Sequence, residues 1–298
     1  MKKITLAVPS FSGGGAERVM VTLANKFYEW GYSVDFIVKT DAGPYKNDLH
    51  HKINKISLTD ENSGRLRKRI TAVFRLWRYF RKSKSDVIMS TLRQFNVFVF
   101  FVRLMSFSGF PLIVREADTL DRIFSNGGIR NKILLFSMKV IYKRCYGVIS
   151  NSLVTKNDLL DRLNLPSKKV NVIYNPLELA TIQIKIAKQT KPLSKSVVAC
   201  GRLNSKKNFS DLIRAMPLVR EKFPDITLTI LGEGADKVNL EKLSAELGLE
   251  GIVELPGFVD NPYSYFAKAD VFVQTSLWEG FGYVLVEAMA CGTPVVAY

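Results

Sequence analysis

Residues 278–298 carry the strongest signal in the sequence and read WEGFGYVLVEAMACGTPVVAY. The short apolar segment before them, residues 270–275, predicts a buried strand. Residues 278–282 then predict a glycine-hinged turn, residues 283–290 an apolar helix, and residues 294–298 a second buried strand. This order of strand, turn, helix and strand is typical of a parallel α/β sheet.

Two carboxylates lie in this unit, Glu279 in the turn and Glu287 two turns along the helix. The helix is apolar on nearly every side, so the carboxylate of Glu287 needs a partner. The turn glycines, Gly280 and Gly282, leave backbone N–H groups bare at the start of the helix, where an anion is favoured. The unit therefore predicts a site for a polar, anionic ligand.

The same stretch resembles the Glu-x7-Glu motif of retaining nucleotide-sugar glycosyltransferases of glycosyltransferase family 4, which have the GT-B fold. The resemblance implies that Glu279 contacts hydroxyls of the donor sugar and that Glu287 binds the nucleotide ribose. The other donor contacts that it implies here are Gly280, Phe281, Gly282 and Val284.

A second loop with suitable chemistry lies between an expected strand at residues 196–200 and an expected helix at residues 209–221. Its cations, Arg202 and Lys207, are five residues apart and suit a diphosphate. They resemble the family's Gly-Arg…Lys pair, which grips the donor diphosphate, so Arg202, Lys207 and Glu279 are the expected catalytic residues. The stretch with Gly257 and Phe258 resembles the loop that touches the nucleotide base.

A glycine-rich loop also follows the first expected strand, residues 4–8, and precedes a helix that begins at Ala16. Strand, glycine loop and helix are the arrangement of a phosphate cradle. The third glycine of the dinucleotide fingerprint is absent, and glycine loops also simply turn corners. Because the loop resembles the family's first loop, which lines the donor–acceptor cleft, Gly14 and Gly15 are expected donor contacts.

Charged residues end the expected strand 111–116, at the edge where parallel sheets place their sites. These residues, Arg115, Glu116 and Asp118, are the expected contacts on the acceptor side. Many relatives have a histidine near this point, and this chain has none.

The net charge of +16 lies in the first part of the chain. Residues 1–185 hold 31 Lys and Arg against 14 Asp and Glu, which gives +17, whereas residues 186–298 hold 12 against 13, which gives −1. Such an excess predicts a polyanionic partner, an anionic membrane surface or nucleic acid. Nucleic acid is the weaker alternative, because the basic residues fall on helices within a strand–helix pattern.

Residues 65–84 predict a helix with nine basic residues and no acid. Its apolar stripe is Leu66, Ile70, Val73, Trp77 and Phe80. One interpretation puts this stripe in the core with a solvated basic back. The other places the basic arc on an anionic bilayer, at roughly 1 kcal/mol for each cation. The residues of that arc are Arg67, Lys68, Arg75, Arg78, Arg81 and Lys82.

The phenylalanine-rich segment 94–107 fits a core helix or an interfacial element equally well. A further basic amphipathic helix is expected over residues 129–146. The longest apolar run, residues 97–102, is interrupted by Arg103, so no membrane-spanning helix is expected. Three cysteines without close pairing and the lack of a signal peptide predict a cytosolic protein. Together with the basic helices, they predict a location on the inner face of the membrane.

The predicted fold is α/β, with two doubly wound Rossmann-like domains in the GT-B architecture. Residues 1–176 form the basic acceptor-side domain, residues 177–195 a linker, and residues 196–298 the donor domain, which is expected to be incomplete and C-terminally truncated. The ligand is expected between the domains, at the carboxyl ends of the strands.

The predicted function is transfer of a sugar, with retention, from a nucleotide diphosphate donor, expected to be a UDP-sugar. The expected acceptor is membrane-associated and polyprenyl-linked, as in bacterial-type polysaccharide or cell-surface glycan synthesis. No Asp-x-Asp occurs, so neither a metal nor another cofactor is expected. The alternatives are a nucleotide-sugar epimerase of the same fold and a basic membrane- or nucleic-acid-binding module without catalysis.

Overall fold

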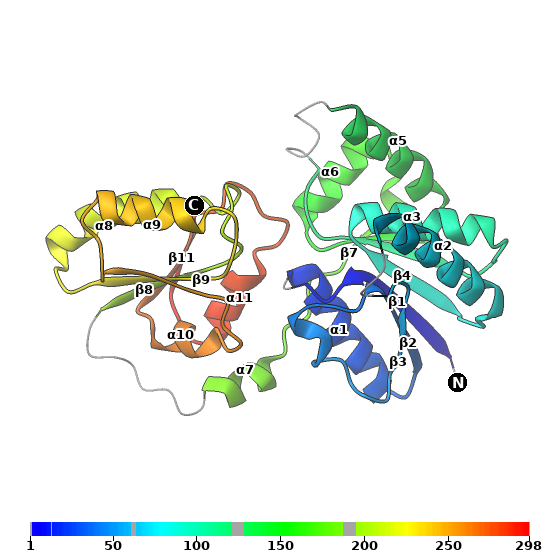
Figure 1. Cartoon of the computed structure of the whole chain (residues 1–298), viewed down its shortest axis with the longest axis horizontal. Helices are drawn as coiled ribbons and strands as arrows, with labels where there is room; N and C mark the ends of the chain where they lie inside the picture. The colour runs from blue at the N-terminus through cyan, green and yellow to red at the C-terminus, as the bar shows by residue number, and fades with distance from the viewer. Residues whose placement is uncertain (1, 13, 61–63, 121–127, 187–194, 298) are drawn as a thin grey trace. The chain divides into compact units, whose positions relative to one another are not determined.

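The chain forms two compact units, Met1–Pro176 and Leu177–Tyr298, which are described separately (Figure 1). The structure, a computed structural model, describes residues 2–12, 14–60, 64–120, 128–186 and 195–297. Each unit has a parallel sheet with helices on both faces.

The sheet of the first unit has seven strands in the order β3-β2-β1-β4-β5-β6-β7, all parallel. Strand β1, inside this sheet, is apolar on both faces because helices cover both sides, as Leu6 and Ala7 show with no exposed surface. The strands are β1 (Lys3–Ser10), β2 (Ser33–Thr40), β3 (Asn54–Ser57), β4 (Val87–Thr91), β5 (Leu112–Glu116), β6 (Gly147–Ser150) and β7 (Val170–Val172).

Two separate cores hold the helices of the first unit against its sheet. One core packs α1 against β1 and β2, and the other packs α2, α3, α5 and α6 against the opposite face. The helices are α1 (Gly15–Glu29), α2 (Arg65–Lys82), α3 (Arg93–Met105), α5 (Ile129–Arg144) and α6 (Leu153–Leu163), with short 3-10 turns at Pro44–Lys46 and Ser167–Lys169.

Helix α2 buries only the C-terminal part of its predicted stripe: Phe80 lies in the core, and Val73 and Trp77 pack against it. Its core side chains are Ala72, Leu76 and Phe80. Leu66 and Ile70 are 71% and 62% exposed, so the stripe as a whole does not face the core. The sequence allowed the error because both sets of residues recur at three- and four-residue steps.

Helix α3 places part of the phenylalanine-rich segment in the core, and the interfacial interpretation stays a prediction for the rest. Phe95 and Phe100 lie in the core, whereas Phe101 is half exposed and Phe107, just past the helix, is 90% exposed. Among the described residues, no helix combines the length and the apolar character needed to cross a bilayer.

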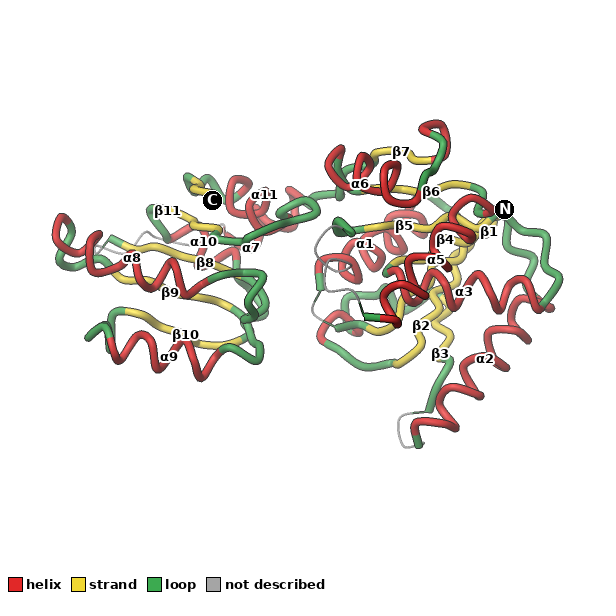
Figure 2. Tube along the Cα trace, turned by 90° about the horizontal axis from the view of Figure 1, so that it is seen from above, coloured by secondary structure: helices red, strands yellow, loops and turns green. Residues whose placement is uncertain are grey.

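The sheet of the second unit has five parallel strands in the order β10-β9-β8-β11-β12. Figure 2 shows α8 and α9 along the β8–β9–β10 part of the sheet, while α7, α10 and α11 pack in the other core. The strands are β8 (Ser196–Cys200), β9 (Thr227–Leu231), β10 (Val253–Gly257), β11 (Val271–Gln274) and β12 (Val295–Ala297). The helices are α7 (Leu179–Ile186), α8 (Phe209–Lys222), α9 (Lys237–Glu246), α10 (Tyr263–Lys268) and α11 (Tyr283–Ala290).

The predicted linker 177–195 is wrong over its first half. Residues Leu179–Ile186 form α7, and Ile182 is buried with Phe266 and Phe272 in the core of the second unit. A helix this short, with one buried isoleucine, shows no clear period of apolar residues in the sequence, so it could not be predicted. It is stabilised by tertiary packing and not by its own helix propensity. Residues 187–194 of the predicted linker lie outside the described part of the chain.

Candidate functional site

Two loops of the second unit meet at the carboxyl ends of neighbouring strands. Residues 201–208 follow β8, and residues 275–282 follow β11, which pairs with β8. The N–H of Leu277 donates to the carbonyl of Lys206 at 2.9 Å, and Thr275 Oγ1 donates to the carbonyl of Lys207 at 2.9 Å. These bonds fix the two loops together at the edge where parallel sheets bind ligands.

An ion pair joins the catalytic residues that the sequence predicts on these loops. Lys207 Nζ lies 2.6 Å from Glu279 Oε1, and Lys206 Nζ lies 3.6 Å from Glu279 Oε2. Burial alone would raise the pKa of Glu279, but the ammonium groups of Lys207 and Lys206 outweigh it and hold that pKa below its ordinary value. Glu279 is therefore an ionised carboxylate with a cation at either side.

Glycine at position 201 lets the Lys207 side chain pass close to the backbone. A Cβ on Gly201 would lie 2.7 Å from Cε of Lys207, which is closer than real Cβ contacts allow. Lys207 thus crosses directly over the backbone at the end of β8. The other predicted cation, Arg202, is exposed beside it.

The helix predicted after the turn is α11, and Gly282 is its N-cap with a left-handed φ of 69°. This backbone conformation favours glycine, and no acidic residue lies in the first turn of α11. The first turn of α11 thus carries no negative charge of its own that would repel an anion, and the anion site expected at its N-terminus stays a prediction.

Glu287 is buried on α11, and the hydroxyl of Tyr263 donates to its Oε1 at 2.9 Å. The prediction that this carboxylate needs a partner is confirmed. The identity of the partner was missed, because Tyr263 begins α10, 24 residues earlier, and nothing in the sequence marks the pairing.

The remaining predicted donor residues line the same edge of the sheet. Gly257 ends β10 with a φ of 88°, and a Cβ there would overlap the Glu233 carboxylate. The next residue, Phe258, is half exposed. In the turn, Gly280 is buried and Phe281 lies 6.4 Å from Tyr283 between ring centroids, while Val284 is half-buried in the first turn of α11.

The glycine loop of the first unit differs from a phosphate cradle. Glu17 is buried in the first turn of α1, where its Oε1 accepts a hydrogen bond from Ser12 Oγ at 2.8 Å. Its carboxylate lies so close to Gly14 that a Cβ there would overlap it, whereas Gly15 is exposed. A carboxylate already placed at this helix N-terminus disfavours a phosphate beside Gly14, and the donor contacts expected at Gly14 and Gly15 stay predictions.

Arg115 and Glu116 are poor acceptor contacts because both are buried, at 3% and 1% exposed. Arg115 donates to Asn175 Oδ1 at 2.5 Å, and Asp118 is half-buried, with its carbonyl accepting from Arg93 Nη2 at 3.2 Å. The predicted role of Arg115 and Glu116 as direct contacts is therefore corrected to a structural one.

Glu116 belongs to a buried polar cluster. The hydroxyl of Tyr142 and Nδ2 of Asn96 donate to Oε1, and Nε of Arg93 lies 3.6 Å from Oε2. Burial raises the pKa of Glu116 even though Arg93 opposes the change. Arg93 was missed, although it follows the end of β4 just as Arg115 lies at the end of β5.

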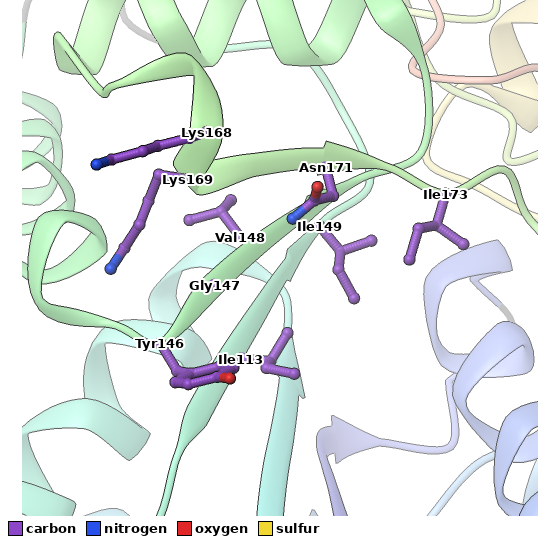
Figure 3. Close-up of a pocket in the computed structure, with 9 residues that line it drawn as sticks. All are labelled: Ile113, Tyr146, Gly147, Val148, Ile149, Lys168, Lys169, Asn171 and Ile173. Atoms are coloured by element: carbon purple, nitrogen blue, oxygen red, sulfur yellow. The ribbon is translucent and has the colours of Figure 1, made fainter.

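The first unit has a pocket of about 220 Å³. Figure 3 shows it along β6 and β7, with Tyr146, Lys168 and Lys169 at the amino ends of the two strands. The carboxyl ends of a parallel sheet are the expected place for a ligand, so this pocket is not the candidate site.

Comparison with known proteins identifies the family. The model of Glycosyltransferase Family 4 matches residues 13–181, and the model of Glycosyl transferases group 1 matches residues 182–298. A relative in Campylobacter jejuni, N-acetylgalactosamine-N,N'-diacetylbacillosaminyl-diphospho-undecaprenol 4-alpha-N-acetylgalactosaminyltransferase, is 28% identical over 299 residues, which are 99% of this chain and 80% of the relative.

Solved structures share the fold over the whole chain. Anabaena HepE in complex with UDP and glucose superposes with a TM-score of 0.79 at 23% identity, over 100% of this chain and 80% of that one. The lipopolysaccharide glycosyltransferase WaaG gives 0.74 at 13% identity, over 99% and 80%. Because the family 4 model covers more than half of the sequence, the chain belongs to glycosyltransferase family 4, and its two parallel-sheet units are those of the GT-B fold.

Proposed function

We propose that the protein transfers a sugar from a UDP-sugar to a polyprenyl-linked glycan acceptor, with retention, at the cytoplasmic face of a membrane. The name of the Campylobacter jejuni relative places its substrate on diphospho-undecaprenol, and Anabaena HepE binds UDP and UDP-glucose. These relatives support the donor and acceptor classes, and family membership supports retention and a role in surface glycan synthesis.

The observation that carries the proposal is the Lys207–Glu279 pair at 2.6 Å. A cation held at the edge of the sheet is placed to offset the negative charge that grows on a leaving diphosphate. Arg202, exposed on the same loop, is the second cation in this role. The N-terminus of α11 supplies backbone N–H groups that add to the same field.

The two glutamates contact different parts of the donor. Glu279, ionised and half-buried, accepts hydrogen bonds from hydroxyls of the sugar while it orients Lys207. Glu287, buried beside Tyr263, accepts from the ribose. Neither residue serves as a nucleophile in this proposal, and the cations take the place of a metal ion.

The acceptor side of the proposal rests on the charge of the first unit. Helix α2 contains no acidic residue, and α5 adds Arg130, Lys132, Lys139, Lys143 and Arg144. Phosphate groups of an anionic bilayer complement this field and hold the enzyme near a lipid-linked acceptor. A positive field of this extent attracts an anionic membrane surface, and it would serve no purpose for a small soluble acceptor.

The proposal is tested by incubating the purified chain with UDP-glucose, UDP-galactose and their N-acetylhexosamine counterparts in turn, with an undecaprenyl diphosphate-linked sugar as acceptor. We expect one donor to yield an extended lipid-linked product whose new anomeric centre has the donor's configuration by NMR, with and without EDTA. An isomerised nucleotide sugar without transfer would support the epimerase. No consumption and no binding of any UDP-sugar would overturn the assignment.

A further inference from the structure

Tyr263 and Glu287 form a buried pair in the second unit, where helices α7, α10 and α11 share one core (Figure 1). Tyr263 begins α10 and is 1% exposed, and Glu287 lies on α11 and is 2% exposed. The hydroxyl of Tyr263 donates to Oε1 of Glu287 at 2.9 Å. A buried hydroxyl and a buried carboxylate are both costly without a partner, so this bond fixes the two side chains against each other.

We propose that Tyr263 is a positioning residue, which holds the Glu287 carboxylate in place for the ribose and so makes the site selective for ribonucleotides over deoxyribonucleotides. The inference rests on the ribose contact proposed above for Glu287. A carboxylate accepts hydrogen bonds at about four lone-pair positions, so the bond from Tyr263 does not exhaust its capacity. A carboxylate that is already held loses little freedom when the donor binds, and this preorganisation strengthens its contact with the ribose.

The ring of Tyr263 is held on more than one side. Phe266 meets it edge to face, with ring centroids 6.2 Å apart, and Nζ of Lys185 on α7 lies 5.6 Å from its centroid. At the N-cap of α10, Pro262 has a φ of −67°, a value that the proline ring fixes. The side chain of Asn261 donates to the carbonyl of Lys185 at 3.3 Å, so the start of α10 is tied to α7. The hydroxyl of Tyr263 is therefore a donor at a fixed place.

The loop before α10 connects this pair with the expected contacts to the nucleotide base. Gly257 ends β10, and Phe258 follows it. Residues 259–262 lead from there directly to Tyr263. One continuous segment thus carries the expected base contacts at its start and the positioning residue for the ribose at its end. The cation proposed to face the leaving diphosphate, Lys207, belongs to another loop, so a change at Tyr263 should act on nucleotide binding and not on the departure of the diphosphate.

The role of the hydroxyl is tested with UDP and with dideoxyuridine diphosphate, which lacks both hydroxyls of the ribose ring. Tyr263→Phe keeps the aromatic ring and its packing, so circular dichroism should show an unchanged fold. By calorimetry we expect the wild type to bind UDP at least about ten-fold more tightly than the dideoxy nucleotide. Tyr263→Phe should lose most of this preference while its affinity for the dideoxy nucleotide stays the same. The matched control is Tyr265→Phe, which should keep the preference, because Tyr265 lies on the same helix and is 38% exposed.

Two further measurements separate positioning from a structural role. A tyrosine that only satisfied a buried carboxylate would, when removed, weaken the binding of both nucleotides equally. In a double-mutant cycle, Tyr263→Phe should cost no further affinity for UDP once Glu287→Gln is present, because Tyr263 acts through that carboxylate. In transfer assays, Tyr263→Phe should raise KM about ten-fold and leave kcat within about two-fold of the wild type.

Equal weakening of both nucleotides by Tyr263→Phe, or additive losses in the double-mutant cycle, would overturn the inference. A wild type that binds both nucleotides equally, or a Glu287→Gln variant that keeps the preference for UDP, would overturn the proposed ribose contact and the inference with it. A preference that disappears in Glu287→Gln and persists in Tyr263→Phe would disprove only the inference. Selective binding of UDP without sugar transfer would disprove only the proposed function.

Discussion

The two sheets of the molecule are built on one plan, but they differ in where their charges lie. In the second unit, opposite charges meet at the end of the strands, with Lys207 Nζ 2.6 Å from Glu279. In the first unit, α2 carries its cations on the outside and shows apolar side chains such as Ile70 beside them. The fold is the same, so side chains on a few loops and helices make the difference, and under the proposed function one unit holds the donor while the other faces a lipid surface.

The largest effect is expected from the buried cluster of the first unit. Glu116→Ala leaves the guanidinium of Arg93 without its carboxylate, and breaking a buried charge pair costs about 3–5 kcal/mol. Chemical denaturation should show this loss in the free energy of unfolding. An unchanged midpoint would mean that Glu116 is not structural, which would reopen its predicted role on the acceptor.

Transfer itself should depend most on the second unit. Lys207→Ala removes the cation proposed to face the leaving diphosphate and should lower kcat by about 10²–10³-fold. Lys206→Ala is the matched control, because Lys206 is 3.6 Å from Glu279 and also lies over the Trp278 ring. Equal losses of kcat in the two variants would show that the total positive charge of the loop matters and that the position of the Lys207 side chain does not.

The two glutamates should separate binding from chemistry. Glu287→Gln should weaken UDP binding by about 1.5–3 kcal/mol, the range for a hydrogen bond to a charged group, while Glu279→Gln should mainly slow transfer. Calorimetry with UDP measures the first effect and a transfer assay the second. If Glu279→Gln loses UDP affinity and Glu287→Gln keeps it, the proposed roles are reversed.

A smaller effect tests the charged surface of the first unit. Arg78→Gln should weaken binding to anionic vesicles by about 1 kcal/mol, which is roughly five-fold. Arg75→Gln is the control, because the Arg75 guanidinium already pairs with Asp60 at 2.9 Å and contributes less to the field. Vesicle flotation measures both, and equal binding of the wild type to neutral and anionic vesicles would contradict the membrane proposal.

The smallest effect is a dependence on pH. The pKa of Glu279 is lowered, so its ionised form stabilises the second unit above the ordinary carboxyl pKa, and that contribution disappears as the pH falls through the lowered value. In the Lys207→Gln variant one cation is gone while Glu279 stays buried, so the pKa of Glu279 should rise. The loss of stability should therefore begin at a higher pH. NMR titration of the Glu279 carboxyl checks this, and an unchanged pKa in the variant would show that Lys207 does not set it.

The alternation of strands and helices followed from the sequence because buried parallel strands are continuous apolar runs, as in β1. The loops with Arg202, Lys207 and Glu279 were predicted from local motifs. The contact of Lys207 with Glu279 was not, because the two are 72 positions apart and nothing in the sequence shows which atoms meet.

The errors share a physical cause. Two sets of apolar residues on α2 have nearly the same period, so only packing decides that Leu76 is buried and Ile70 is exposed. In the same way, only the fold reveals that Ile182 is a core residue, that Tyr263 meets Glu287, and that Glu17 lies against Gly14.

Helix α7 determines where the chain can be divided for biochemical work. Ile182 fills the core around Phe266 and Ala288, so a recombinant donor domain that starts at Ser196 would expose these side chains to water and tend to aggregate. One that starts at Leu177 keeps the helix and its buried isoleucine. The usable cut lies before α7, after Pro176, and isotope-labelled samples for the NMR titration should be prepared with that boundary.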